Sequence, residues 1–413
     1  MAPHPFLKSI KPVNLLSFGP NTEEIELRPL NILIGPNGSG KSNLVEIIRL
    51  LCMLPEKEPW GTVLQTGGAD EWLWQGGRHQ DPRASVTANV QWDMPHNERF
   101  ANEPLVYEYK IGLDKFQTLF QVASESLRMA DRSDGYHARN TEFVRRGTLG
   151  ELHVRISSRN ESLPLFELVS DRSVLSQIAD RQLLEAGVAR SLPEIIQIRD
   201  FFDRFEFHQD WEFGADLSAR DPVVAGQSVD RLDESGLNLA QIVAHLKDFY
   251  RPTFERMNEL MSQFSGDFKS LDVRLYGASL QLAIQEESGF STSAYRLSDG
   301  TLRWIALLTI LLNPNPAPVT CLDEPELGLH PDAIHVLANL LRDASTRTQL
   351  IVTTHSDALV DAFSDDPETV CVCEKMEGST VIRRLEEGKL KVWLKDYSLG
   401  HLWMSGEIGG NRW

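Results

Sequence analysis

A glycine-rich turn near the start of the chain carries the residue types that bind phosphate. The stretch "GPNGSGKS", residues 35 to 42, fits G-x-x-x-x-G-K-[ST] and lies between an apolar strand and a helix. In that geometry the backbone N–H groups of the loop point at a β-phosphate, Lys41 reaches the β- and γ-phosphates, and Ser42 ligates Mg²⁺. The alternative is a plain glycine turn, which this strand and helix context disfavours. We therefore expect a nucleotide to contact Asn37, Gly38, Ser39, Gly40, Lys41, Ser42 and Asn43.

Two acids end a second apolar strand. In "APVTCLDEPELGLHP" the strand finishes at Asp323 and Glu324. A carboxylate at a strand tip beside a phosphate loop can help to hold Mg²⁺, and the next one can position and deprotonate a water molecule for attack on a γ-phosphate. Taken alone, such a pair is usually a solvated turn. Together with the phosphate loop it predicts that Asp323 binds the metal and that Glu324 is the catalytic base.

A histidine follows the next strand. His355 comes at the end of "LIVTTHSDAL", one helix after the acids, so it is expected at the same edge of the sheet. A lone histidine is more often structural than catalytic. Here the position favours a catalytic role, as a sensor of the γ-phosphate.

A second helix start offers another anion site. In "LSDGTLRWIALLTILL", residues 297 to 312, Ser298 and Asp299 can cap backbone N–H groups, and Gly300 would let another molecule approach closely. A helix N-terminus has free donors and a partial positive charge. Since the chain already has one phosphate site, we expect Ser298 and Gly300 to serve a nucleotide held by a second copy. That arrangement is a head-to-tail dimer with ATP at each interface.

The hydrophobic periodicity places these motifs in an α/β fold. The opening stretch reads as strands, a glycine turn and a helix from about Lys41, and β-rich segments from roughly 84 to 170 suggest an antiparallel layer. Helical patterns follow between about 175 and 265, where Pro252 marks a kink or a junction of two helices. After residue 266, strands and helices alternate, which implies a mainly parallel sheet completed by distant parts of the chain.

This organisation suggests four segments. They are an N-terminal part of the nucleotide-binding head with the β layer (1–170), a helical insertion (171–265), a C-terminal part of the head (266–388) and a docking tail (389–413). The role of the insertion stays open: it can bind a partner or only support the head.

Composition limits the classes of partner. The chain has 41 Lys and Arg against 59 Asp and Glu, a formal net charge of −18 over 413 residues, so a broadly basic nucleic-acid surface is not expected. No apolar run is long enough to cross a bilayer and the start lacks a signal peptide's apolar core, so we expect a cytoplasmic protein. Cys52, Cys321, Cys371 and Cys373 form no metal-spaced set and are expected as thiols packed in a sheet.

The four motifs together resemble a known family. "GPNGSGKS", "LSDGT", "LDEP" and "TTHS", in that order, resemble the ABC-type ATPase heads of the RecF, SMC and OLD proteins, over about 1 to 80 and 266 to 375. The resemblance implies an ABC-type P-loop ATPase that binds ATP and Mg²⁺ and hydrolyses ATP to ADP and phosphate. It also implies a Walker A loop, an ABC signature, a Walker B strand with catalytic Glu324, and the switch histidine His355. The signature departs from LSGGQ at Asp299 and Thr301.

Further features narrow the branch. "DEPELGLHP" looks like the OLD and RecF-like predicted ATPases, labelled AbiEii-type or AAA-21, and the long spacing between phosphate loop and signature is unlike that of transporter subunits. OLD nucleases carry a TOPRIM nuclease domain after the head, for which the chain after His355 is too short. The resemblance thus suggests the ATPase half of a split antiphage-defence system whose effector nuclease is a separate chain.

Two features are left open by the sequence. The family glutamine that links Mg²⁺ to the partner copy could be Gln75 in "WLWQGG" or Gln209 in "FHQDWEF". The tail from 397 to 413 reads as neither helix nor clear strand and holds Trp403 and Trp413. It is expected either to dock on a partner or to fold back on its own head, with no preference between the two.

Three functions remain as alternatives. The leading one is an ATP-hydrolysing switch, a homodimer or higher oligomer, that gates an effector in response to foreign nucleic acid or another signal of invasion. The second is a RecF-like DNA-repair clamp that binds duplex DNA, against which the acidity of the chain argues. The third is a non-hydrolysing scaffold, which would require a damaged Walker B strand or switch histidine, and both are intact.

Overall fold

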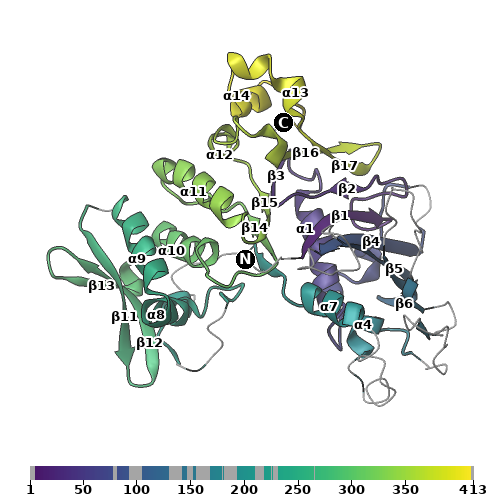
Figure 1. Cartoon of the computed structure of the whole chain (residues 1–413), viewed down its shortest axis with the longest axis horizontal. Helices are drawn as coiled ribbons and strands as arrows, with labels where there is room; N and C mark the ends of the chain where they lie inside the picture. Colours follow the sequence, from purple (N-terminus) through teal and green to yellow (C-terminus); the bar gives the residue numbers. More distant parts are fainter. Residues whose placement is uncertain are drawn as a thin grey trace, which may run out of the picture. The chain divides into compact units, whose positions relative to one another are not determined.

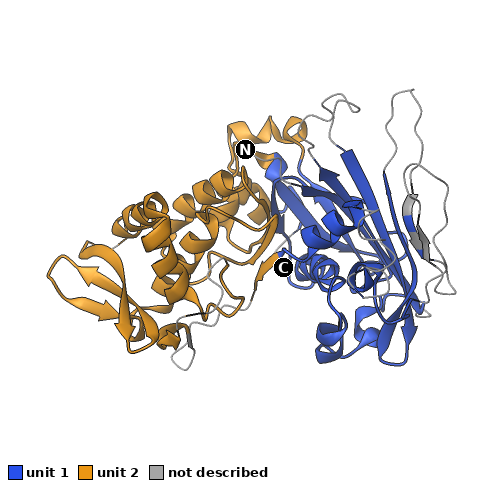
Figure 2. Ribbon diagram, turned by 60° about the horizontal axis from the view of Figure 1, so that its bottom comes forward, with its two compact units in different colours: residues 1–205, 368–385, 405–413 blue, residues 206–367, 386–404 orange. Residues whose placement is uncertain are grey.

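The strand and helix around the glycine turn form where the pattern predicts them. Strand β3 (Leu30–Ile34) is buried along its whole length, and helix α1 (Lys41–Met53) begins directly after Gly40. In this computed structural model the described residues are 5–77, 81–92, 105–129, 142–146, 152–154, 168–178, 180, 193–209, 218–224, 226, 231–264 and 266–410. The chain folds into two compact units, coloured separately in Figure 2. Unit 1 comprises 1–205, 368–385 and 405–413, and unit 2 comprises 206–367 and 386–404.

An antiparallel sheet makes up much of unit 1. Alternating burial along β4 and β5 is the signature of a strand with one buried face, and neighbouring strands pair antiparallel throughout. This confirms the predicted antiparallel layer. In spatial order the strands are β2 (Ile25–Glu26), β1 (Phe6–Val13), β4 (Arg83–Trp92), β5 (Leu105–Phe116), β6 (Leu119–Met129), β7 (Glu142–Arg146) and β8 (Leu152–Val154).

Unit 1 also holds the parallel pair that carries the glycine turn. Strand β16 (Val370–Met376) lies parallel to β3, and β17 (Ser379–Arg384) returns antiparallel to β16 (Figure 1). Cys371 and Cys373 are buried on β16, so burial raises the pKa of the Cys371 thiol to about 11. Within the described part of this unit, the helices are α1, α2 (Gly61–Gln65), α3 (Ala69–Trp72), α4 (Val174–Gln177) and α7 (Pro193–Phe202).

Three parallel strands belong to unit 2. Strand β14 (Val319–Asp323) lies between β15 (Gln349–Thr353) and β9 (Glu206–His208) and is parallel to both. Helix α11 (Pro331–Ala344) connects β14 to β15, and the short α12 (Asp357–Asp361) follows β15. The strands β14 and β15 are predicted correctly, and the parallel pairings confirm the α/β class.

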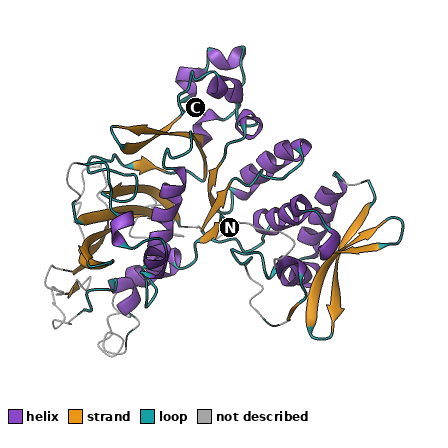
Figure 3. Cartoon of the chain, turned by 180° about the vertical axis from the view of Figure 1, so that it is seen from behind, coloured by secondary structure: helices purple, strands orange, loops and turns teal. Residues whose placement is uncertain are grey.

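A second, smaller sheet belongs to unit 2. It consists of β10 (Val223–Val224), β12 (Ser279–Glu286), β11 (Phe268–Tyr276) and β13 (Ser291–Ser293), all paired antiparallel. Figure 3 shows these strands beside the helices of the same unit. Helices of this unit include α8 (Leu239–Phe249), α9 (Arg251–Ser262) and α10 (Asp299–Leu311). Pro252 occupies the first turn of α9, so it marks a junction between two helices, where its missing N–H costs nothing.

The stretch from 171 to 265 differs from its helical expectation. It contains β9, which pairs with β14 of the parallel sheet, and it contributes α4 and α7 to unit 1 but α8 and α9 to unit 2. Three residues of β9 are too few for a hydrophobic period to be read, which is why the sequence pattern misses this strand. The predicted helix beyond residue 178 lies outside the described residues.

The C-terminal segment also departs from expectation. Residues 399 to 404 form helix α14 (Leu399–Met404), after the short α13 (Glu387–Leu390), although their glycine content predicts no helix. Trp403 is buried, and Asp361 of α12 accepts a hydrogen bond of 2.5 Å from the backbone N–H of Gly400. For this helix the structure therefore matches the alternative in which the tail folds onto its own chain. Trp413 lies outside the described residues. In the described part of the chain, no helix has the length and apolarity needed to cross a membrane.

Candidate functional site

Contacts within unit 1 explain the glycines of the phosphate loop. Gly35, Gly38 and Gly40 have φ of 148°, 74° and 102°, a region that L side chains rarely adopt. A Cβ at Gly35 would stand 2.3 Å from the carbonyl oxygen of Cys373, and one at Gly40 would stand 2.1 Å from Oγ1 of Thr380. Gly38 has open space around its position. The loop is thus packed against β16 and β17 at two of its glycines and open at the third.

Thr380 fastens this loop from the start of β17. Its hydroxyl lies 2.8 Å from the carbonyl oxygen of Ser39 and 2.6 Å from Oγ of Ser17, and its backbone N–H donates to the carbonyl of Ser17 at 2.7 Å. Thr380 is itself buried. The sequence pattern gives no sign of the bond between Thr380 and Ser39, because these residues are 341 positions apart.

The side chain of Lys41, the cation of the phosphate loop, is buried and donates hydrogen bonds to the loop itself. Lys41 is 6% exposed, and its ammonium donates to the carbonyl oxygens of Gly35 at 2.8 Å and Pro36 at 3.1 Å. Helix α1 begins without a side-chain cap and without an acidic residue in its first turn. Its N-terminal N–H groups and partial positive charge are therefore suited to an anion, with the exposed Ser42 and the half-buried Asn43 beside them.

The predicted acids and the histidine come together in unit 2. Asp323 is the last residue of β14 and accepts a hydrogen bond from the Thr353 hydroxyl, at the end of β15. Nε2 of His355 lies 3.7 Å from Oε1 of Glu324, and the two side chains are 27% and 29% exposed. Both are thus half-buried and within reach of solvent. Strand ends, acids and histidine meet here as the strand order of the sequence implied.

Glu324 has a strained backbone. Its φ of 43° lies in the left-handed region, which is uncommon for a residue with a side chain. Two hydrogen bonds hold its N–H there, to the carbonyl oxygen of Thr353 at 3.1 Å and to the Thr353 hydroxyl at 3.2 Å. The same threonine hydroxyl bonds Asp323. Thr353, which the sequence analysis did not single out, therefore orients both acids.

A third acid, Glu326, follows this pair and is more deeply buried than Glu324. Glu326 is 8% exposed and accepts hydrogen bonds from the Thr354 hydroxyl and, at 3.3 Å, from the backbone N–H of His355. Burial raises the pKa of the Glu326 carboxyl, against the opposing effect of the Thr354 hydrogen bond. In the sequence its only signal is that it follows the acid pair immediately after a proline.

The start of α10 is capped by its own chain. Oγ of Ser298 accepts the N–H of Thr301 at 3.1 Å, as predicted for a cap, whereas Asp299 instead pairs with the buried guanidinium of Arg220. A Cβ at Gly300 would stand 2.3 Å from the carbonyl oxygen of Gly328, so packing within the unit already requires this glycine. The N–H groups of Asp299 and Gly300, which a helix leaves without an internal partner, are the donors suited to a ligand.

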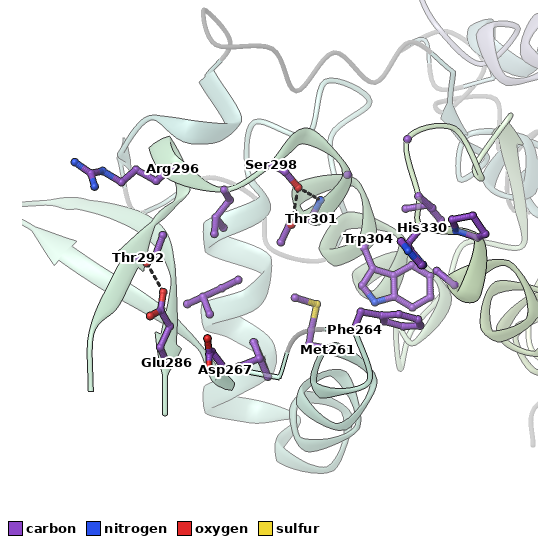
Figure 4. Close-up of a pocket in the computed structure, with 18 residues that line it drawn as sticks. Met261, Phe264, Asp267, Glu286, Thr292, Arg296, Ser298, Thr301, Trp304 and His330 are labelled. Atoms are coloured by element: carbon purple, nitrogen blue, oxygen red, sulfur yellow. Dashed lines mark hydrogen bonds between the residues drawn. The ribbon is translucent and has the colours of Figure 1, made fainter. Parts of the chain in front are cut away.

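A cavity of about 740 Å³ adjoins this helix start (Figure 4). Its wall includes Ser298, Gly300 and Thr301 from the start of α10, and the indole of the buried Trp304. Polar groups, among them Arg296 and His330, also line it. Ser298 is therefore exposed at the edge of a hollow rather than on a flat surface.

The structure does not select the family glutamine. Gln75 is exposed and donates to the carbonyl oxygen of Asp70 at 2.7 Å, and Gln209 follows β9 and is half-buried. Neither position sets one candidate above the other.

The two predicted magnesium ligands, each taken within its own unit, have the donor chemistry that this ion takes. Mg²⁺ prefers hard oxygen ligands and binds through one or two protein groups, water and phosphate oxygens, not through an all-protein cage. Ser42 supplies an exposed hydroxyl, and Asp323 supplies a carboxylate whose orientation Thr353 fixes. Among the residues the structure describes, no cluster of three or more His, Cys, Asp or Glu could form a metal cage, and Mg²⁺ needs none.

Comparison with known proteins identifies a family. Residues 30–361 match the family described as "AAA domain, putative AbiEii toxin, Type IV TA system". None of the curated proteins searched matches the chain.

Solved structures share the fold at low identity. The SMC head bound to the C-winged helix domain of ScpA is 14% identical, with a TM-score of 0.50, over 93% of this chain and 99% of that one. The Smc head domain with an extended coiled coil, bound to the C-terminal domain of ScpA from Pyrococcus furiosus, is 13% identical, with a TM-score of 0.54, over 95% and 99%. The chain is therefore an ATPase with the ABC-type head fold of the RecF and SMC class, and it belongs to the AAA-domain family that matches residues 30–361.

Proposed function

We propose that this ATPase is a nucleotide-controlled dimeric switch that gates a separate effector chain in antiphage defence. The observation that carries the catalytic part is the meeting of Asp323, Glu324 and His355 at the ends of β14 and β15. Carboxylates and a histidine gathered at strand ends can hold Mg²⁺, activate water and contact a γ-phosphate.

In the proposed reaction, the phosphate loop binds the ATP phosphates through its backbone N–H groups and Lys41. Glu324 accepts a proton from water as the water oxygen attacks the γ-phosphorus, and the bond to the β,γ-bridging oxygen breaks to give ADP and phosphate. We assign the contact with the γ-phosphate, and the sensing of its departure, to His355, and the distance of 3.7 Å between its Nε2 and Oε1 of Glu324 supports this role. Ser42 and Asp323 are the residues that would hold Mg²⁺, which would supply charge stabilisation.

The start of α10 supports the dimeric part of the proposal. Asp299 and Gly300 offer N–H groups at an exposed helix end, and the chain has a separate phosphate loop at Gly35 to Ser42. We propose that ATP on the loop of one copy is completed by Ser298 and Gly300 of the other, so ATP closes the dimer and hydrolysis opens it.

Two observations support a partner chain. The two SMC heads named above are each bound to a domain of another protein, and the matching family description names a toxin–antitoxin system. The net charge of −18 favours a protein partner over direct capture of duplex DNA. We therefore propose a nuclease-like effector whose access or activity follows the state of the dimer.

Solution mass under three conditions tests the proposal. The protein is measured without nucleotide, with ATP, and as Glu324→Gln with ATP, and each form is used to purify partners from the native host. We expect the mass to double with ATP, most completely in Glu324→Gln, whose hydrolysis should slow by roughly 10²–10⁴-fold. Glu386→Gln, an exposed carboxylate in unit 2, is the control and should behave as wild type. A protein that stays monomeric and instead binds duplex DNA in a salt-sensitive manner is a repair clamp.

A further inference from the structure

Glu326 connects the loop after β14 to the loop after β15. Its backbone follows the acid pair by two residues, and its carbonyl oxygen accepts the N–H of Leu329 at 3.1 Å in a tight turn. Its side chain is buried and reaches across to Thr354 and His355, which are 28 and 29 positions away. One carboxylate thus holds two loops that are remote in the sequence.

The contacts on the loop after β15 form a short chain of hydrogen bonds. Oε1 of Glu326 accepts from the hydroxyl of Thr354, which is fully buried, and from the N–H of His355. The oxygen of the same hydroxyl accepts the N–H of Ser356 at 2.9 Å. Ser356 in turn caps α12 by accepting the N–H of Leu359 at 3.2 Å. The backbone on both sides of His355 is therefore fixed through Glu326.

His355 is consequently held by two acids at different atoms. Its imidazole faces Glu324 at 3.7 Å, while its backbone N–H bonds Glu326 at 3.3 Å. We propose that Glu326 is a positioning residue for hydrolysis: it sets the place of the His355 side chain relative to Glu324 by fixing the backbone of residues 354 to 356. The inference rests on the catalytic roles proposed above for Glu324 and His355.

The energetics of burial favour this role over a merely solvated acid. Removing the carboxylate would take the acceptor from the buried Thr354 hydroxyl and from the part-buried His355 N–H, and an unpaired buried donor is costly. Among the residues the structure describes, Oε2 of Glu326 has no hydrogen-bond partner, and the two hydrogen bonds from residues remote in the sequence, Thr354 and His355, both go to Oε1. Glu324 and Arg303 are charged groups that interact electrostatically with the Glu326 carboxyl.

Substitutions at Glu326 separate positioning from stability. Glu326→Ala removes the acceptor, whereas Glu326→Gln keeps an oxygen that can accept from Thr354 and His355. We expect kcat for ATP hydrolysis to fall roughly 10- to 100-fold in Glu326→Ala, since small misplacements of catalytic groups cost that much, with KM for ATP changed less than about threefold. Glu326→Gln should stay within about threefold of wild type, because the hydrogen-bond geometry persists.

A double variant supplies the stricter readout. If Glu326 acts through His355, adding Glu326→Ala to His355→Ala should reduce kcat little further, because the group being positioned is gone. Gln241→Ala is the matched control, since Gln241 is a buried hydrogen-bonding side chain of α8 in the same unit. Losses that multiply in the double variant, or an effect of Glu326→Ala no larger than that of Gln241→Ala, would overturn the proposal.

Hydrogen exchange keeps the test independent of turnover. In the absence of nucleotide, Glu326→Ala should raise amide exchange in peptides covering 353 to 361, and Gln241→Ala should not. If wild type hydrolyses no ATP, the proposed catalytic roles fail while exchange still decides whether Glu326 holds the loop. Unchanged exchange in Glu326→Ala would show that it does not.

Discussion

Nε2 of His355 and Oε1 of Glu324 lie 3.7 Å apart at the ends of two neighbouring parallel strands. The carboxyl ends of β14 and β15 bring them together, and the positive φ of Glu324 turns its side chain out of the strand direction. A strained backbone held by two hydrogen bonds is a common way to fix a catalytic group. This is the pair on which the proposed chemistry most directly depends.

The first prediction concerns His355. His355→Ala should lower kcat roughly 10²–10³-fold while ATP still binds, because the phosphate loop in unit 1 is untouched. Phosphate release measures the rate, and a fluorescent ATP analogue measures binding. His335→Ala, an exposed histidine on α11, is the control and should keep wild-type activity. A His355→Ala protein with unchanged kcat would remove the histidine from the mechanism.

The second prediction tests whether each ATP is shared between copies. Lys41→Ala damages the phosphate loop, and Ser298→Phe places a bulky side chain at the start of α10. Each variant alone should be inactive. A mixture should regain up to about a quarter of wild-type turnover, because half of the dimers are mixed and each has one intact site. Phosphate release from mixtures at fixed total protein measures this. No recovery, with both variants folded, would mean that the sites are not shared.

The third prediction concerns the glycines of the loop. Gly40→Ala should destabilise unit 1 by about 1–3 kcal/mol, because its Cβ would overlap Thr380 where the backbone is also left-handed. Gly38→Ala, with a similar backbone but open space around it, should cost only the conformational term, about 1 kcal/mol. Urea unfolding followed by tryptophan fluorescence compares the two. Equal losses would mean that the contact with Thr380 contributes nothing.

The fourth prediction is a pH dependence of stability. Glu125 on β6 is fully buried, bonded by Tyr109 at 2.7 Å, Ser173 at 2.6 Å and Val174 at 2.7 Å. Burial raises the pKa of the Glu125 carboxyl above its ordinary 4.5, although these bonds and the charge of Arg146 oppose the shift. The folded state then binds the proton more tightly than the unfolded state does. This contribution to stability is full below pH 4.5 and is lost as pH rises through the raised pKa.

Substitution removes that dependence. In Glu125→Gln, the midpoint of urea unfolding should change less with pH above 4.5 than in wild type, whatever the absolute stability of the variant. Glu23→Gln, an exposed carboxylate in the same unit, should retain the wild-type slope. An identical slope in Glu125→Gln would assign the pH dependence to another group.

Local patterns predicted the phosphate loop, the helix that begins at Lys41 and the Ser298 cap, because each depends on residues a few positions apart. The sequence did not point to Glu326 or Thr380, since their partners are 28 to 363 positions away and no period connects them. Gly300 shows a subtler limit. Its absence of a side chain suggested an approaching ligand, whereas the carbonyl of Gly328 already occupies that space.

The bond between Thr380 and Ser39 also affects the order in which the protein can be made. A nascent chain exposes the phosphate loop early, but the strand that fastens it is synthesised 341 residues later. The parallel pairing of β3 with β16 likewise cannot form until β16 has been synthesised. Ribosome-bound or prematurely terminated chains that stop before residue 370 therefore contain the whole phosphate-binding motif without its support. We therefore expect the loop to gain its support, and nucleotide to bind firmly, only after residue 380 has been synthesised.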